Sequence, residues 1–295
     1  MVKLNVTNTP GLGAGVEQLA EQLAAAEAVL LGAGAGLSVS AGFAYDGRRF
    51  RDNFQDMIDR YGITDMYSGG FYPFPSPEEF WAYWSRMIFV NRFEPPADSP
   101  YPELLELMKG RDYFVLTTNV DHQFQKAGFP KERLFYTQGD YGLFQCGKPC
   151  HKKTYDNEET IRRMVAEQRD LRVPAELLPR CPVCGGLMTM NLRSDDTFVQ
   201  DEGWHVASRR YADFQQRHLS GPVLYLELGV GDNTPGIIKY NFWRRVHENK
   251  NAVYACVNLG EAYAPAEISS RSVCINGDVG EAIGFLCERK NLFFK

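Results

Sequence analysis

The stretch that decides the fold is Val29-Leu30-Leu31-Gly32-Ala33-Gly34-Ala35-Gly36-Leu37-Ser38. Its apolar run predicts a strand over 28–31, which ends in a turn that has almost no side chains. Such a turn lets the backbone close around a bulky ligand, and amide groups at a helix start favour phosphate. The glycines alternate, whereas the usual dinucleotide-binding spacing is G-x-G-x-x-G, so a standard dehydrogenase loop is not predicted. The alternative is a tight strand-to-helix turn that holds no ligand.

The composition is that of a globular protein. The chain has 295 residues, of which 44% are hydrophobic and 23% charged, enough for one large domain or two smaller ones. Its net charge of −5, with lysines and arginines interspersed, does not favour binding to nucleic acid or to an anionic membrane. No apolar run approaches the ~20 residues of a membrane span, and residues 1–5 do not resemble a secretion signal. We therefore expect a cytoplasmic protein.

Predicted strands and helices alternate along most of the chain. Further strands are predicted at 113–118, 134–136, 223–228, 252–257 and 272–275, and helices at 234–247 and 279–288. Residues 43–54 are predicted to form a loop. The alternation predicts an α/β fold, a parallel sheet with helices on both faces, formed by residues 1–45, 101–139 and 216–295. Residues 46–100 and 140–215 are expected to form a smaller lobe.

Four predicted loops at strand ends carry polar residues or glycine. They are Gly32–Ser38, Thr118–Asp121, Gly229–Asn233 and the position of Asn258. In sheets of this class, ligands bind outside the carboxyl ends of the strands. Because these four ends share one edge, the sequence predicts a binding cleft there.

Four of the seven cysteines form two close pairs, and the other three stand alone in apolar surroundings. The pairs have the spacings C-x₃-C and C-x₂-C, which resemble a four-cysteine zinc ribbon with one widened knuckle. Four thiolates leave no open position for water, so the ion would hold the small lobe together without taking part in chemistry. The alternatives are unpaired structural thiols, or His151 in place of one ligand. The predicted ligands are Cys146, Cys150, Cys181 and Cys184.

These motifs together resemble the sirtuin family, whose order they follow along most of the chain. They are the glycine loop with Ser38, Thr118-Asn119-Val120-Asp121, Gln138-Gly139, the two cysteine pairs, Gly229-Val230-Gly231 and Val257-Asn258. The resemblance implies a Rossmann-like domain and a small lobe, made of a helical module and a zinc module, with NAD bound between the two.

Three departures from the usual sirtuin pattern point to a subgroup. Gln138 stands where sirtuins have a catalytic histidine, Ala44–Phe50 replaces Pro-Asp-Phe-Arg, and Gly229–Gly231 replaces Gly-Thr-Ser. This combination, with the segments 141–146 and 224–231 and with Arg193, resembles the macrodomain-linked class M sirtuins. The resemblance implies a protein ADP-ribosyltransferase that acts on a lipoylated glycine-cleavage H-like protein, with a macrodomain hydrolase as a further partner.

The resemblance also implies residue roles. Asn119 would orient the ribose. Asp121 would favour the productive nicotinamide geometry, or it would merely cap a helix. Arg193 would orient the acceptor or the cofactor, or it would be a solvated surface residue. Phe50 would cover the nicotinamide pocket or pack in apolar surroundings, and Arg48 and Arg49 are equal candidates for phosphate contacts. Ser38 and the amides of 33–36 would face the pyrophosphate, and Gly229, Asn258, Asp278 and Val279 the adenosine end. The full set implied to contact NAD is Gly32, Ala33, Gly34, Ala35, Gly36, Ser38, Phe50, Thr118, Asn119, Asp121, Gln138, Gly229, Val230, Gly231, Asn258, Asp278 and Val279.

Gln138 separates the candidate activities. A sirtuin deacylase needs a general base at a ribose hydroxyl, and a carboxamide has no titratable proton, so deacylation should fall by ~10²–10⁴-fold. Transfer of ADP-ribose to an acceptor does not use that step. The alternatives are an NAD glycohydrolase, a weak deacylase and a non-catalytic NAD sensor, and retention of Asn119 and Asp121 speaks against the last.

Overall fold

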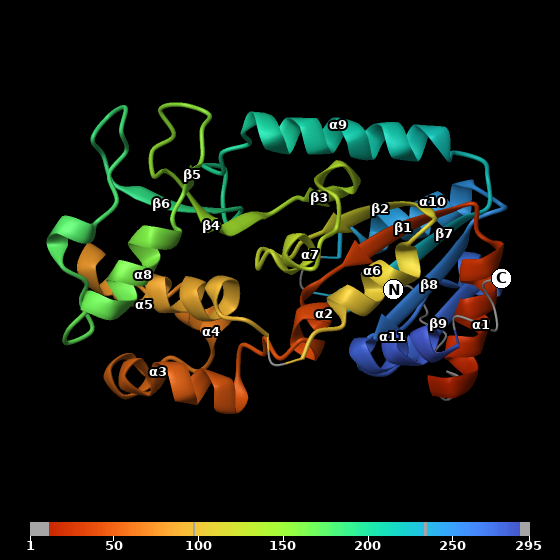
Figure 1. Ribbon diagram of the computed structural model, residues 1–295, viewed down its shortest axis with the longest axis horizontal. Coiled ribbons are helices and arrows are strands. Elements are labelled where there is room, and N and C mark those ends of the chain that lie inside the picture. The colour runs from red at the N-terminus through yellow and green to blue at the C-terminus, as the bar shows by residue number, and fades with distance from the viewer. Residues whose placement is uncertain (1–11, 97, 233–234, 290–295) are drawn as a thin grey trace.

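A computed structural model describes residues 12–96, 98–232 and 235–289 (Figure 1). Residues 1–5, which do not resemble a secretion signal, lie outside this range. Asn233 of the third predicted loop and the first residue of the helix predicted at 234–247 also lie outside it. No helix in the described part of the chain is long and apolar enough to cross a membrane.

The large domain is built on a six-stranded parallel sheet, which confirms the predicted fold class. Its strand order is β3-β2-β1-β7-β8-β9, with β1 paired on both sides along its whole length. The bounds are β1 Ala28–Ala33, β2 Asp112–Thr117, β3 Leu134–Tyr136, β7 Val223–Leu228, β8 Val253–Asn258 and β9 Ser272–Asn276. Each predicted strand lies within two residues of the observed one.

Helices cover both faces of this sheet because successive strand residues alternate between two hydrophobic cores. In β1, Val29 and Leu31 belong to the core shared with α1, α6 and α11, whereas Ala28 and Leu30 belong to the core shared with α9 and α10. The bounds are α1 Leu12–Ala25, α2 Ala35–Ser40, α6 Tyr101–Met108, α7 Gln123–Lys126, α9 Glu202–Arg217, α10 Lys239–Glu248 and α11 Val279–Glu288, with short helices η2 Lys131–Arg133 and η4 Ala266–Arg271.

The smaller lobe, on the left in Figure 1, has its own core and a three-stranded antiparallel sheet in the order β5-β4-β6. Aromatic side chains dominate this core, among them Trp81 and Phe144, whose ring centroids are 5.2 Å apart. The bounds are α3 Gly47–Tyr61, α4 Met66–Gly69, α5 Pro77–Ile88, η1 Phe89–Phe93, β4 Gly139–Cys146, β5 Tyr155–Asp156, α8 Glu158–Glu167, η3 Ala175–Leu177 and β6 Met188–Leu192.

Two predictions about the fold are wrong, and a third is shifted, because the helix predicted at 234–247 begins only at Lys239. The segment predicted as a loop at 43–54 contains the start of helix α3, where Phe50, Phe54 and Met57 are buried at helical spacing beneath a charged outer face. The small lobe also ends earlier than residue 215, because α9 packs on the large sheet. Phe214 of that helix lies 5.7 Å from Phe114 of β2, measured between ring centroids. The charged residues of both helices conceal the periodicity of the buried ones.

Candidate functional site

The loops after β1 and β7 meet at the point where the strand order reverses, which is the ligand-binding position of open α/β sheets. They pack so closely that a Cβ on Gly34 would lie 2.7 Å from the carbonyl oxygen of Gly229, and one on Gly36 would lie 2.7 Å from the Gly229 Cα. The Gly36 N–H donates to the same carbonyl over 2.9 Å. The glycines therefore close two loops against each other.

This geometry corrects the roles expected for part of the glycine loop. The Gly34 N–H donates to the carbonyl of Leu228 over 3.0 Å, and the Gly36 N–H to Gly229, so both amides already have partners and do not face a pyrophosphate. Gly32 serves packing, since a Cβ there would lie 2.3 Å from the Ile238 side chain. Ala33 is buried at the end of β1, and only Ala35 of this loop is exposed.

Gly229→Ala should destabilise the protein by about 2–5 kcal/mol. Gly229 has φ +62°, and an added Cβ would lie 2.5 Å from the Leu37 nitrogen. Left-handed backbone costs ~1–2 kcal/mol for a residue with a Cβ, and overpacking adds ~1–3 kcal/mol. The matched control is Gly110→Ala, where φ is +77° but nothing lies within 4 Å of the added atom. Denaturant unfolding should separate the two variants, and equal losses would contradict the close packing of the loops.

A buried polar network joins the first two loops. The Asn119 side-chain amide donates to the Gly34 carbonyl over 2.9 Å and to the Ser38 hydroxyl over 3.1 Å. The Ser38 hydroxyl in turn donates to the Asp121 carboxylate and lies 2.9 Å from the Tyr101 hydroxyl. Ser38 is therefore turned into this network, so its expected contact with a pyrophosphate is not supported. The network fixes Asn119 and Asp121 relative to the glycine loop.

The Asp121 carboxylate lies in an electrostatically unusual place. Burial raises its pKa above the ordinary value, partly offset by hydrogen bonds from Ser38 and the Gln123 backbone, while the nearby Asp140 charge raises it further. Among the described residues no cation forms an ion pair with Asp121. When ionised, such a carboxylate stabilises a positive charge that develops beside it, as in an oxocarbenium-like transition state. Asp121 also accepts from the N–H of Gln123, the first residue of α7, over 3.2 Å, although the N-cap position of that helix belongs to His122.

Gln138 and Arg193, from different parts of the chain, are brought together. The Arg193 N–H donates to the Gln138 carbonyl over 3.0 Å. The half-buried Gln138 carboxamide forms no hydrogen bond with any residue that the structure describes, so it is available to a ligand. The Arg193 guanidinium is exposed and lies 5.7 Å from the centre of the Phe198 ring. The Gln138 segment runs beside the Asn119 loop, because the Tyr141 N–H donates to Val120 over 2.8 Å.

The small-lobe candidates separate into buried and exposed residues. Arg49 is held inside the lobe by Asn91 at 2.9 Å and by the Val90 carbonyl at 2.6 Å. Arg48 is 90% exposed with only a surface pair to Asp52, so it is the arginine available to a phosphate. Phe50 is 3% exposed and packs in the small-lobe core, so it does not cover a pocket.

The residues expected at the adenosine end also differ in exposure. The Asn258 amide donates to the Val230 carbonyl over 3.0 Å, which joins the loops after β7 and β8, while Gly231 is exposed between them. Val279 is 2% exposed in the core, so its side chain cannot reach a ligand. Asp278 caps α11 by accepting from the Glu281 N–H, and its other oxygen accepts from Ser40 at 2.9 Å. The contacts of Asp278 and Val279 with NAD therefore stay predictions, with the Val279 side chain packed in the core.

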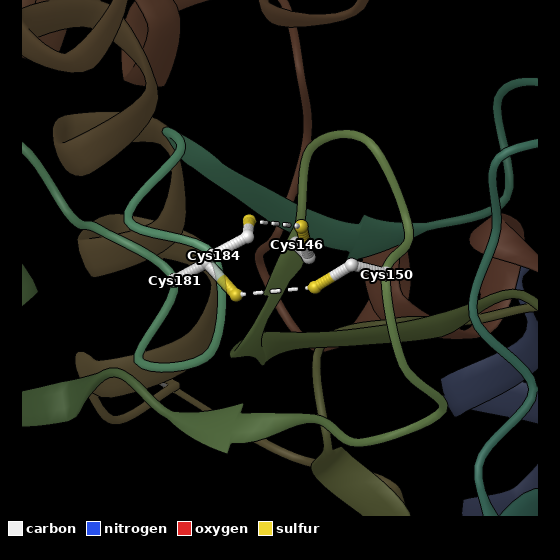
Figure 2. A group of neighbouring side chains, drawn as sticks. All are labelled: Cys146, Cys150, Cys181 and Cys184. Atoms are coloured by element: carbon white, nitrogen blue, oxygen red, sulfur yellow. Dashed lines mark hydrogen bonds between the residues drawn. The ribbon is translucent and has the colours of Figure 1, made fainter.

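The four paired cysteines converge in the small lobe, as predicted (Figure 2). Their sulfur atoms all lie within 4.8 Å of one another, with Cys146 and Cys184 separated by 3.7 Å and Cys150 and Cys181 by 3.6 Å. A tetrahedral site with Zn–S bonds of about 2.3 Å places sulfurs roughly 3.8 Å apart, so the cluster fits a structural zinc ion. His151 Nδ1 lies 3.1 Å from the Cys150 sulfur, outside the four-sulfur set.

Tyr101 is a residue of the site that the sequence analysis missed. Its hydroxyl contacts both Ser38 and Asn119, and burial raises its pKa well above the ordinary value, so it stays a neutral hydrogen-bonding group. The sequence signal is indirect: Tyr101 begins α6, and the preceding Asp98-Ser99-Pro100 is a pattern typical of a helix start. Nothing in that motif shows that α6 points its first residue at the glycine loop.

Comparison with known proteins agrees with this fold. No family model matches the chain. It is 38% identical over 259 residues to the protein ADP-ribosyltransferase of Staphylococcus aureus, covering 88% of this chain and 82% of that protein. It is 34% identical over 287 residues to a probable bifunctional ADP-ribose hydrolase/ADP-ribosyltransferase of Fusarium oxysporum f. sp. cubense, covering 91% of this chain and 47% of that protein.

Solved structures share the fold of this chain. A complex of Sir2 with a p53 peptide and NAD⁺ has a TM-score of 0.59 at 22% identity, covering 94% of this chain and 99% of that one. A complex of Sir2 with an acetylated peptide has a TM-score of 0.55 at 19% identity, covering 94% of this chain and 99% of that one. Fold and site thus define a protein of the Sir2 type. The chain belongs to the sirtuin family and, within it, groups with the protein ADP-ribosyltransferases.

Proposed function

We propose that this enzyme transfers ADP-ribose from NAD to a side chain of a lipoylated glycine-cleavage H-like protein and releases nicotinamide. Its proposed partner is a macrodomain hydrolase that removes the modification. We further propose that the protein is a class M sirtuin and that it is cytoplasmic. The Fusarium relative named above carries both an ADP-ribose hydrolase and an ADP-ribosyltransferase in its name, which supports this pairing.

The observation that carries the proposal is the environment of Gln138. A carboxamide without a hydrogen-bond partner among the described residues lies beside the loop of Asn119 and Asp121. It can hold ribose hydroxyls but cannot take their protons, so the step that returns a ribose oxygen to an acyl group has no base there.

The other residues are assigned by their surroundings. Asn119, fixed by Gly34 and Ser38, would orient the ribose that carries nicotinamide. Asp121 would stabilise the positive charge that develops as the bond from ribose C1′ to nicotinamide breaks. The exposed guanidinium of Arg193 would orient the acceptor. Of the residues implied to contact NAD, those that are not buried are Ala35, Gly36, Thr118, Asn119, Gln138, Gly231 and Asp278.

The test is incubation of the protein with NAD and lipoylated or unlipoylated H-like protein, followed by intact-mass measurement. Lipoylated acceptor should gain the mass of one ADP-ribose while nicotinamide is released in equal amount. Equal nicotinamide release without acceptor would indicate an NAD glycohydrolase, the second candidate, because Gln138 could equally hold ribose while water attacks. Rapid removal of acetyl groups from an acetyl-lysine peptide would contradict the assignment of Gln138.

A further inference from the structure

His122 is the histidine that lies at the candidate site. It directly follows Asp121 in the loop after β2, immediately before α7, and its φ of 66° is left-handed. A residue with a Cβ adopts this conformation at a cost, and such strain is concentrated at functional sites. The four other histidines lie outside the loop after β2. They are His151, His205 of α9, His218 and His247 of α10.

The His122 ring is oriented by a buried carboxylate. Its Nδ1 pairs with Asp140, whose side chain is 5% exposed and also accepts from Arg92 at 2.8 Å and from the Gly142 N–H at 2.7 Å. Burial alone would raise the pKa of Asp140, but its partners His122 and Arg92 hold it below the ordinary value. Asp140 is therefore an anion, and the Nδ1–H of His122 can donate to it.

The opposite ring nitrogen of His122 remains available. The side chain is 28% exposed, and Nε2 has no hydrogen-bond partner among the residues that the structure describes. A lone pair on Nε2, with Nδ1–H held by a carboxylate, is the arrangement of a general base with its orienting group. Asp140, which orients the His122 ring, lies two residues after Gln138, so the orienting carboxylate and the Gln138 carboxamide come from one segment.

We propose that His122 is the general base that activates the acceptor for transfer, which rests on the proposed function above. Nε2 takes the proton from the O–H, N–H or S–H group of the acceptor, and that atom forms the new bond to ribose C1′. The bond from C1′ to the nicotinamide nitrogen breaks with its electron pair, which leaves neutral nicotinamide. His122 then returns its proton to solvent.

Several charged side chains surround this histidine. The carboxylates of Asp140 and Asp121 and the cations of Arg92 and Lys126 are nearby. The Lys126 ammonium donates to the Arg92 carbonyl. Since only a neutral imidazole accepts a proton, a base of this kind makes transfer faster at higher pH.

The test compares the pH–rate profiles of wild-type protein and of His122→Asn. Asparagine tolerates the left-handed backbone and can still donate to Asp140, but it cannot take a proton. Transfer to lipoylated acceptor should fall by ~10²–10⁴-fold and lose its rise with pH, whereas NAD binding, measured calorimetrically, should stay within twofold. His205→Gln on α9 is the matched control and should keep the wild-type rate and pH profile.

Each result decides a separate question. A wild-type protein that transfers nothing to the acceptor contradicts the proposed function and the acceptor base together. An active wild type with an equally active His122→Asn variant overturns the base alone, as does a slow variant that keeps the wild-type rise with pH. If His122→Asn melts early, Asp140→Asn gives the same decision, because it leaves His122 in place but removes the charge that orients it.

Discussion

Asn119→Ala should lower ADP-ribose transfer by ~100-fold or more while the protein stays folded. The Asn119 amide holds the Gly34 carbonyl and the Ser38 hydroxyl, and we propose that it also orients the ribose. A misplacement of about 1 Å at a reacting centre can cost ~10²-fold in rate. Loss of its hydrogen bonds should cost only about 1–3 kcal/mol of stability. The measurement is the initial rate of labelled ADP-ribose transfer, with a thermal melt of the same sample.

The matched control for Asn119 is Asn251→Ala. Asn251 is exposed near the start of β8, where its amide donates to the Ser220 carbonyl over 3.0 Å. It should retain the wild-type rate. An Asn119→Ala protein that transfers within twofold of wild type would remove Asn119 from the mechanism and would favour a purely structural network around Ser38.

Cys181→Ser should release the zinc ion and open the small lobe. Cys146 and Cys181 are buried in the same core as Ile161 and Met188. Loss of the ion should therefore loosen that core and expose it to solvent. Structural zinc contributes about 10–16 kcal/mol in small peptides at neutral pH, which equals or exceeds the free energy of unfolding of a typical domain, about 5–15 kcal/mol. Zinc content by elemental analysis should fall below one ion per chain, and backbone hydrogen exchange should rise in β4 and β6.

Exchange in β1, β2 and β7 should change little, because their two cores do not include the cysteine cluster. Cys274→Ala is the control, since Cys274 lies in β9, outside the four-sulfur set, and should keep the ion. A Cys181→Ser protein that retains one zinc and wild-type exchange would show that the cluster does not hold the metal.

Much of the large domain could be predicted because its signals are local. Apolar runs such as 28–31 and 223–228 are buried on both faces, so they read as strands without tertiary information. The α3 and α9 segments were missed or misplaced because charged residues outnumber the buried ones. Phe50 was implied to cover a pocket, yet helix α3 turns it into the small-lobe core.

The sequence by itself determined the α/β class, the sirtuin resemblance and the cysteine set, since these depend on residue type and spacing. Only the tertiary structure decided which groups are already engaged. It showed that Gly34 and Gly36 close loops through their own amides, that Tyr101 completes the Asn119 network, and that Asp140 holds the His122 ring. The physical reason is that a hydrogen bond between residues far apart in the chain depends on how the elements pack, which no local pattern encodes.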